Sequence, residues 1–450
     1  MTETPHVFVR VEIEVDGTHA RGIAADHLPP KWFTKNPRTS FDEEIREMRR
    51  VILHAVRISA GLVGETVFSV WRTLYQKQKR WGKENGLPAL LSNFGCSLVE
   101  RALIEAFCRA TQTTFAQAAR ENSLGIQWGE LDAGLTGKHL SDFLPAQPAR
   151  ELTIRQTLGI ADPLTDDEIA PANRVNDGLP ESLEGLIRRY GLQHFKMKIT
   201  GEAETDIEQL KTFLDLIERF SISDFRFTID GNELFHSLEG FQSYWNRITE
   251  DARINASLSR LLFVEQPFHR DIALDAEHLS GLDIWRTRPP ILIDESDADL
   301  ESLPRALSLG YSGTSHKNCK GVFKSLLNFC RLEHLRRSSH ADDMPLLMSV
   351  EDLVNIGPVA LQQDLAVAAL LGISSVERNG HHYFAGLSAF PNEVQQQVLH
   401  AHPDLFERHS SGGYPVVKMN RGKMCVESVN ASPFGVGFEL EVSQFPPLPD

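Results

Sequence analysis

Cysteine is scarce in this sequence of 450 residues, and its five cysteines form no C-x-x-C pair. An odd number of scattered thiols argues against a disulfide framework and a thiolate zinc site, and favours a reducing compartment. The N-terminus has no basic stretch followed by an apolar core, which a secretory signal would need. No window approaches the roughly 20 apolar residues of a membrane span. We therefore expect a cytoplasmic protein with no membrane partner.

Basic residues are also in deficit, with 46 Lys and Arg against 61 Asp and Glu and a formal net charge of −15. Such a charge repels a phosphate backbone, so nucleic acid is excluded as an expected partner. The glycine-rich motifs G-x-G-x-x-G and G-x-x-x-x-G-K-[ST] are missing as well, which argues against a doubly wound nucleotide-binding sheet. The hydrophobic fraction of 41% is that of an ordinary globular protein.

The pattern of apolar and polar residues changes along the chain and divides it into three parts. The first 25 residues alternate apolar and polar around Asp16-Gly17, which predicts an antiparallel hairpin. Helical patterns follow from about Phe41 to Glu121. We predict an α+β domain over residues 1–150, a second domain over 151–394, and a C-terminal segment over 395–450 that packs back onto the first domain.

The second domain alternates short apolar runs with amphipathic stretches of helical length. The runs are TIRQTLGI, HFKMKIT, FRFTID, LLFVEQP, ILIDESD, YSGTSHK, PLLMSV and ISSVERN. About eight strand–helix repeats without a nucleotide-binding motif predict a closed parallel β/α barrel of the TIM type, an α/β fold.

Charged residues stand at the carboxyl ends of five successive predicted strands. In chain order they are Lys196 and Lys198, Asp230, Glu265, Asp294 and Lys317. In a barrel, these strand ends assemble the active site. Each carboxylate follows the previous one by about one strand-plus-helix unit, so the three can converge at the barrel mouth.

Three clustered carboxylates need a cation among them, and an oxygen-only donor set favours Mg²⁺ over Zn²⁺. A divalent ion that holds a substrate carboxylate offsets the charge of an enolate as it forms. Lys198 and Lys317 lie on roughly opposite sides of a closed barrel and can address opposite faces of one carbon. Lys196 points to the same side of its strand as Lys198; we expect it to lower the pKa of Lys198 and to pair with the substrate carboxylate.

This pattern resembles the enolase superfamily. Within it, the pattern is most similar to the muconate lactonizing enzyme-like branch of the mandelate racemase/muconate lactonizing enzyme family. The residues that carry the resemblance are FKMKIT, IDGNE, VEQP, IDES and SHKNCKG. It implies a modified (β/α)7β barrel with a capping domain completed by the C-terminal segment, and a homo-oligomer. It also implies Asp230, Glu265 and Asp294 as ligands of Mg²⁺, for which Mn²⁺ can substitute, Lys198 and Lys317 as catalytic residues, and Lys196 as their helper.

Two departures from the family pattern bear on the reaction. Only one glycine follows Lys320, where the family phrase K-x-x-K-x-G-G has two. The seventh strand is followed by SVEDL and offers no histidine, so the mandelate racemase branch with its His–Asp dyad is disfavoured. His316 should face away from Lys317 and pack in the core.

Further residues are candidates for substrate contact. Asn232 follows the third strand, Glu351 the seventh, and Glu377 and Arg378 the eighth. The resemblance places a substrate-choosing loop at Gly22–Asn36, where Lys31 and Trp32 stand.

The expected function is proton abstraction next to the carboxylate of a small carboxylic acid, by a lyase or an isomerase. Dehydration, racemisation or epimerisation, and cycloisomerisation remain open. Two other readings are a Schiff-base aldolase that uses Lys198 or Lys317 as nucleophile, and a non-catalytic scaffold stabilised by a metal.

Overall fold

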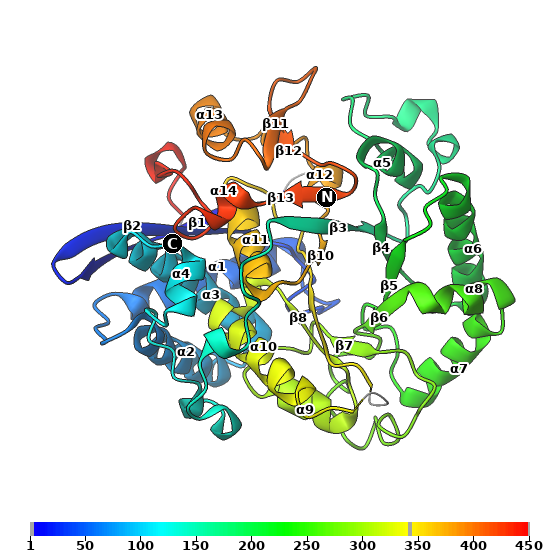
Figure 1. Cartoon of the computed structure of the whole chain (residues 1–450), viewed down its shortest axis with the longest axis horizontal. Helices are drawn as coiled ribbons and strands as arrows, with labels where there is room; N and C mark the ends of the chain where they lie inside the picture. Colours follow the sequence, from blue (N-terminus) through cyan, green and yellow to red (C-terminus); the bar gives the residue numbers. More distant parts are fainter. Residues whose placement is uncertain (1–3, 341–343, 449–450) are drawn as a thin grey trace.

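A closed barrel of eight parallel strands forms the centre of the computed structural model, which describes residues 4–340 and 344–448 (Figure 1). The barrel strands are β3 (Glu151–Leu158), β4 (His194–Lys198), β5 (Arg226–Asp230), β6 (Leu261–Glu265), β7 (Ile291–Ile293), β8 (Gly313–His316), β9 (Leu347–Val350) and β10 (Ser375–Glu377). Each pairs with the next in parallel, and β10 closes the ring on β3. The predicted barrel and its strand order are confirmed.

Helices follow most barrel strands and cover the outside of the ring, as the alternating pattern predicts. They are α5 (Leu183–Tyr190), α6 (Ala203–Arg219), α7 (Leu238–Thr249), α8 (Ala252–Ser257), α9 (Ser302–Leu309), α10 (Val322–Arg336) and α11 (Ala360–Leu371). Helix α11 is buried along its whole length because the C-terminal segment and the N-terminal domain also pack against it. The long segment between β5 and β6 forms α7 and α8.

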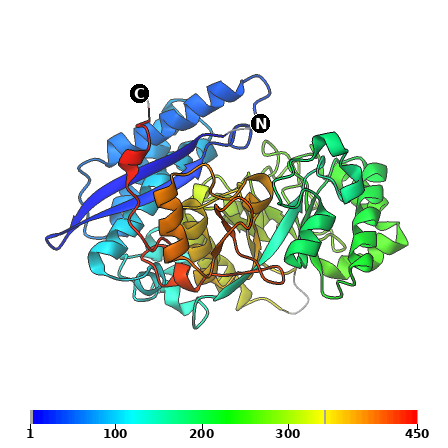
Figure 2. The same ribbon diagram turned by 90° about the horizontal axis from the view of Figure 1, so that it is seen from above.

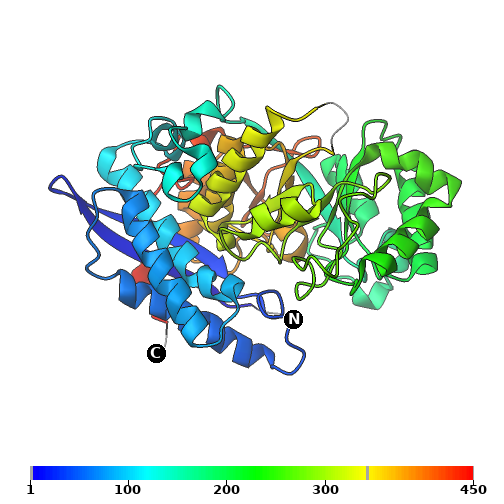
Figure 3. The same cartoon turned by 90° about the horizontal axis from the view of Figure 1, so that it is seen from below.

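The N-terminal part is a small domain of two strands and four helices. Strands β1 (His6–Val15) and β2 (Thr18–His27) pair as the predicted hairpin, and helices α1 (Phe41–Ser59), α2 (Val67–Glu84), α3 (Ala89–Thr111) and α4 (Phe115–Arg120) follow. Figure 2 shows the hairpin and α1 at one end of the molecule, far from the helices α6 to α8; α3 packs against both the hairpin and α1. Figure 3 shows the helices of this domain against the barrel near α10; α3 makes the contact.

The C-terminal segment joins both parts. After β10 the chain forms α12 (Gly380–Tyr383) and α13 (Asn392–Ala401), and the C-terminal segment continues with β11 (Phe406–Arg408), β12 (Pro415–Val417), β13 (Lys423–Cys425) and α14 (Glu427–Asn430). Strand β13 pairs antiparallel with β3 of the barrel. Further on, the ring of Phe445 lies 4.7 Å from that of Phe8 in β1.

One continuous hydrophobic cluster runs through the small domain, the barrel and the C-terminal segment. All five cysteines are free thiols, and four of them are buried. Among the residues that the structure describes, no helix is both long and apolar enough to span a membrane.

Candidate active site

The charged residues predicted at the strand ends meet inside the barrel. Because side chains alternate along a strand, Lys196 and Lys198 of β4 share the inner face, while Met197 between them is part of the outer core. Asp230 and Glu265 end β5 and β6, and Asp294 and Lys317 directly follow β7 and β8. Neighbouring strands therefore present these groups to one another.

The ammonium of Lys196 lies within reach of four carboxylates. Its Nζ is 2.6 Å from Glu265 Oε2, 2.9 Å from Glu351 Oε2, 3.1 Å from Asp230 Oδ2 and 3.3 Å from Glu377 Oε2. Burial alone would lower the pKa of Lys196, but these carboxylates raise it well above its ordinary value. Lys196 is thus a permanently charged centre that ties together strands β4, β5, β6, β9 and β10.

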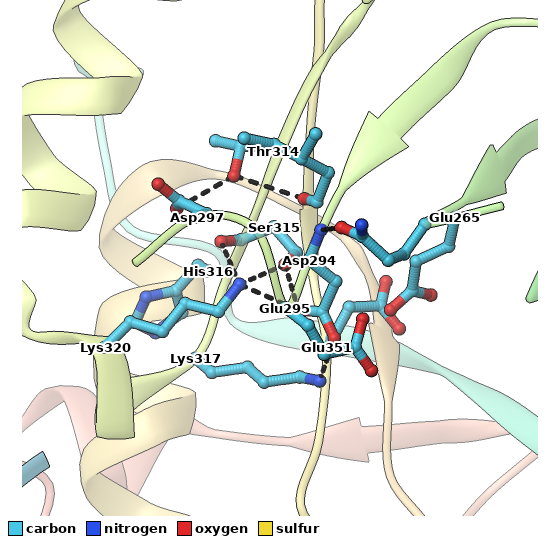
Figure 4. A network of polar contacts seen from close by, with 12 residues as sticks. Glu265, Asp294, Glu295, Asp297, Thr314, Ser315, His316, Lys317, Lys320 and Glu351 are labelled. Carbon is cyan, nitrogen blue, oxygen red and sulfur yellow. Dashed lines mark hydrogen bonds and ion pairs between the residues drawn. The ribbon is translucent and has the colours of Figure 1, made fainter. Parts of the chain in front are cut away.

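A second group gathers on Asp294. Its Oδ2 lies 2.5 Å from Lys317 Nζ, and its Oδ1 accepts from Lys320 Nζ at 2.7 Å and from Ser315 Oγ at 2.5 Å. Figure 4 shows Lys317 and Lys320 converging on Asp294, with Glu265 and Glu351 on the far side of it. Burial raises the pKa of Asp294, but the two lysines hold it well below its ordinary value.

Lys317 resembles Lys196, because nearby carboxylates also raise its pKa. Burial lowers the pKa of Lys317, but Asp294 and Glu265 outweigh burial and raise it above its ordinary value. The number of carboxylates around each lysine depends on how the strands meet, so it is not visible in the sequence near that lysine.

Lys198 stands apart from this cluster, at the open side of the site. Its Nζ lies 3.3 Å from Asn232 Oδ1, and Asn232 Nδ2 donates to Glu295 Oε1 at 3.2 Å. The backbone amide of Asn232 donates to Asp230 Oδ1 at 2.9 Å. The predicted contact residue Asn232 therefore links Lys198 to two carboxylates of the site.

A loop of the small domain reaches the barrel mouth. The Lys317 ammonium lies 4.7 Å from the centre of the Trp32 ring, a cation–π contact. The guanidinium of Arg270, after β6, donates to the carbonyls of Trp32 and Phe33 and pairs with Glu233. Trp32 is thus held over one of the two predicted catalytic lysines.

Two predicted substrate contacts are not brought into the barrel. Lys31 pairs with Glu44 of α1 at 3.0 Å, inside the small domain. Arg378 binds Asp364 of α11 on the outside of the barrel, because it directly follows Glu377, which points inward. Glu351 and Glu377 do join the site, but as partners of Lys196.

His316 packs outside the barrel as predicted. Its side chain is fully buried, with Nδ1 2.7 Å from Ser325 Oγ and Nε2 3.2 Å from Asp364 Oδ1.

Comparison with known proteins gives a match in structure only. No protein-family model matches the chain, and no curated protein matches it in sequence. Muconate lactonizing enzyme from Pseudomonas putida matches with a TM-score of 0.56 at 14% identity, over 97% of this chain and 93% of that one. A mandelate racemase/muconate lactonizing enzyme from Bordetella bronchiseptica matches with a TM-score of 0.55 at 13% identity, over 98% and 96% of the two chains. N-succinyl Arg/Lys racemase from Bacillus cereus matches with a TM-score of 0.53 at 15% identity, over 95% and 90%.

The chain has the fold of the mandelate racemase and muconate lactonizing enzymes. The match extends over nearly all of each chain, so it includes the small domain and the C-terminal segment as well as the barrel. The resemblance noted in the sequence is therefore confirmed at the level of the fold.

The carboxylates inside the barrel are oxygen donors, which suit a hard divalent ion. Asp230, Glu265 and Asp294 are buried carboxylates on three neighbouring strands. Burial and the nearby charge of Glu351 raise the pKa of Glu265 well above its ordinary value. As the side chains stand, no three His, Cys, Asp or Glu groups among residues 4–340 and 344–448 are arranged around one metal position.

Two buried residues at the site were missed by the sequence argument. Glu295 follows Asp294 and has one carboxylate oxygen, Oε2, without a hydrogen-bond partner; burial and Asp294 raise its pKa to about 7. Arg155 of β3 reaches past β10 and pairs with Glu351 at the end of β9. Glu295 could have been noticed as a second acid in IDES, whereas Arg155 lies within a strand and carries no local signal.

Proposed function

We propose that this protein is an enzyme of the enolase superfamily that removes the proton next to the carboxylate of a small carboxylic acid. The observation that carries the proposal is the inner face of β4 to β8, where Lys198 and Lys317 flank three buried carboxylates on the strands between them. The shared fold with racemases, an epimerase and a muconate lactonizing enzyme supports this reaction class.

The proposed cofactor is Mg²⁺, with Mn²⁺ as a possible replacement, held by Asp230, Glu265 and Asp294. When bound, such an ion supplies positive charge that stabilises the enolate as it forms. One enolase-type structure with a matching fold is described as a complex with magnesium and mandelic acid.

The two lysines are assigned the proton transfers. Lys198 sits at the open side of the site beside Asn232, and Lys317 sits under Trp32. A neutral amine at one of them takes the proton, and an ammonium at the other can return one from the opposite face. Racemisation or epimerisation uses both lysines, whereas elimination needs only one of them.

The role proposed for Lys196 differs from the one expected from the sequence, which was to assist Lys198 and pair with the substrate carboxylate. Its four carboxylate contacts leave it as an internal counter-ion. We propose that it keeps Glu351 and Glu377 in place and contributes positive potential toward the substrate carboxylate.

The test is exchange of the α-proton, followed by NMR in deuterated buffer with Mg²⁺. The first compounds are N-acylated amino acids and dipeptides, after the neighbours named as a racemase and an epimerase, and then sugar acids. Lys198→Ala and Lys317→Ala are compared with Lys211→Ala, which removes an exposed lysine paired with Asp251.

We expect exchange that needs Mg²⁺, that persists in Lys211→Ala, and that is lost for at least one stereoisomer in each site variant. Exchange that survives in both Lys198→Ala and Lys317→Ala would rule out the proposed bases. A homo-oligomer and a cytoplasmic location stay predictions from the sequence.

A further inference from the structure

Both neighbours of Lys317 in the chain are held by one carboxylate outside the barrel. Asp364 of α11 is completely buried. Its Oδ1 accepts from the backbone amide of Asn318 at 3.1 Å and lies 3.2 Å from Nε2 of His316. One oxygen therefore contacts the residue before Lys317 and the residue after it.

The same carboxylate also holds the end of another strand. Its Oδ2 accepts from Arg378 Nη2, and Arg378 directly follows Glu377 at the end of β10. Glu377 points inward and lies 3.3 Å from Lys196. Asp364 thus connects the ends of β8 and β10 from outside the ring.

A hydrolytic role for this cluster is excluded by its burial. Ser325, His316 and Asp364 form a Ser–His–Asp line, but each of the three is 2% exposed or less. Ser325 Oγ also donates to the carbonyl of Gly321 at 3.0 Å. No substrate can reach the hydroxyl, so the network acts on the chain around it.

What this network can do is orient Lys317. A side chain at a strand end is aimed by the backbone on both sides of it, and small displacements of a reacting group are costly in rate. Hydrogen bonds to an ionised carboxylate are stronger than neutral ones. Arg378 and His316 keep the pKa of the buried Asp364 below its ordinary value, against the effect of burial.

We infer that Asp364 is a positioning residue that aims Lys317 into the barrel by holding His316 and the amide of Asn318. The role in proton transfer rests on the proposed function, whereas the placement of Lys317 does not. Asp364 contacts His316, Asn318 and Arg378 and lies outside the barrel, away from the carboxylates proposed to bind Mg²⁺, so its effect on the reaction must pass through Lys317 and Glu377.

The first measurement needs no substrate. Amine labelling with acetic anhydride, quantified by peptide mass spectrometry, reports the accessibility and protonation of each lysine. In Asp364→Asn we expect labelling of Lys317 to rise relative to that of exposed Lys211, with labelling of Lys198 unchanged. Ser325→Ala, a matched control, removes the other partner of His316 and leaves all three Asp364 contacts; Lys317 labelling should stay as in the wild type.

The second measurement separates positioning from general loosening. In the α-proton exchange assay, Asp364→Asn should slow the stereoisomer that depends on Lys317 by at least about tenfold. The stereoisomer that depends on Lys198 should change by less than about twofold, because Lys198 lies on β4, away from Asp364. A merely structural defect would slow both.

The two measurements distinguish a failure of this inference from a failure of the proposed function. If no compound exchanges even with wild-type protein, the proposed function fails and the labelling still decides the role of Asp364. Unchanged Lys317 labelling in folded Asp364→Asn, or equal slowing of both stereoisomers, overturns the inference. If Asp364→Asn does not fold, His316→Asn removes one of the two flanking contacts, and the same rise in Lys317 labelling is expected.

Discussion

At the scale of single residues, the charge of Lys196 is central to the stability of the barrel interior. Four carboxylates from four strands lie within 3.3 Å of it, and each of them is buried. Removing one partner of a buried ion pair leaves the other charges without compensation, which costs far more than the intact pair contributes. Lys196 should therefore matter for stability as well as for the reaction.

Lys196→Met is expected to lower the free energy of unfolding by about 3–5 kcal/mol in buffer with a chelator. The comparison is Lys211→Met, whose side chain is 43% exposed and pairs with Asp251 at the surface; it should cost no more than about 1 kcal/mol. Urea unfolding followed by circular dichroism measures both. Equal losses in the two variants would show that the four carboxylates do not depend on Lys196.

At the scale of elements, the hairpin lies directly on α3 because Gly22 has no side chain. A Cβ at this position would lie 2.1 Å from the carbonyl oxygen of Ala102 and 2.3 Å from the amide nitrogen of Ala106. Gly22→Ala should therefore cost about 1–3 kcal/mol, since neither backbone can move without disturbing the domain core.

The control for this variant is Gly61→Ala. Gly61 has a positive φ of 73° but open space around its Cβ direction, so backbone strain alone should cost about 1 kcal/mol. Urea unfolding compares the two variants. A loss in Gly22→Ala that does not exceed the loss in Gly61→Ala would mean that the hairpin can shift on α3.

The anchoring of the C-terminal segment depends on pH, because it uses the neutral form of His402. Nε2 accepts from the amide of Gly437 at 3.1 Å, and Nδ1 lies 2.9 Å from Ser428 Oγ. Burial lowers the pKa of His402 to about 4 from an ordinary value of 6.5. Between these two values the unfolded chain binds the proton and the folded chain does not, so stability falls as the pH drops from 6.5 to 4.

His402→Gln cannot titrate in this window. Its disadvantage in unfolding free energy relative to wild type should shrink as the pH falls, by up to about 1.4 kcal/mol per pH unit. Urea unfolding of both proteins at pH 7, 6 and 5 gives the difference directly. A difference that stays constant over this range would show that His402 is not kept neutral by the fold.

At the scale of the whole molecule, a ligand that binds only the folded barrel raises the midpoint of unfolding. If the carboxylates hold Mg²⁺ as proposed, a concentration of 100 times the dissociation constant stabilises the protein by about 2.7 kcal/mol. Differential scanning calorimetry with and without Mg²⁺ should show this shift in wild type. Asp215→Asn, which changes an exposed carboxylate paired with Arg253, should keep the shift, and Asp294→Asn should lose it. The same shift in Asp294→Asn would place the ion elsewhere.

The sequence by itself determined the elements and their order. The hairpin at Asp16-Gly17 and the eight strands follow from periodicity and turn residues, which are local properties of the chain. Alternation along single strands likewise predicts that Lys196, Lys198 and Lys317 point into the barrel. The same alternation separates Arg378 from Glu377: because the two residues are adjacent, only one of them can point inward.

The tertiary structure alone decided which charges meet. Nothing near Lys196 in the chain indicates that carboxylates at the ends of β5, β6, β9 and β10 surround it and raise its pKa well above the ordinary value. Asp364 lies in the middle of an apolar helix, and only packing brings it against both flanks of Lys317. Periodicity specifies the face on which a side chain stands, whereas its partner and its protonation depend on distances between segments far apart in sequence, which are set when the barrel closes.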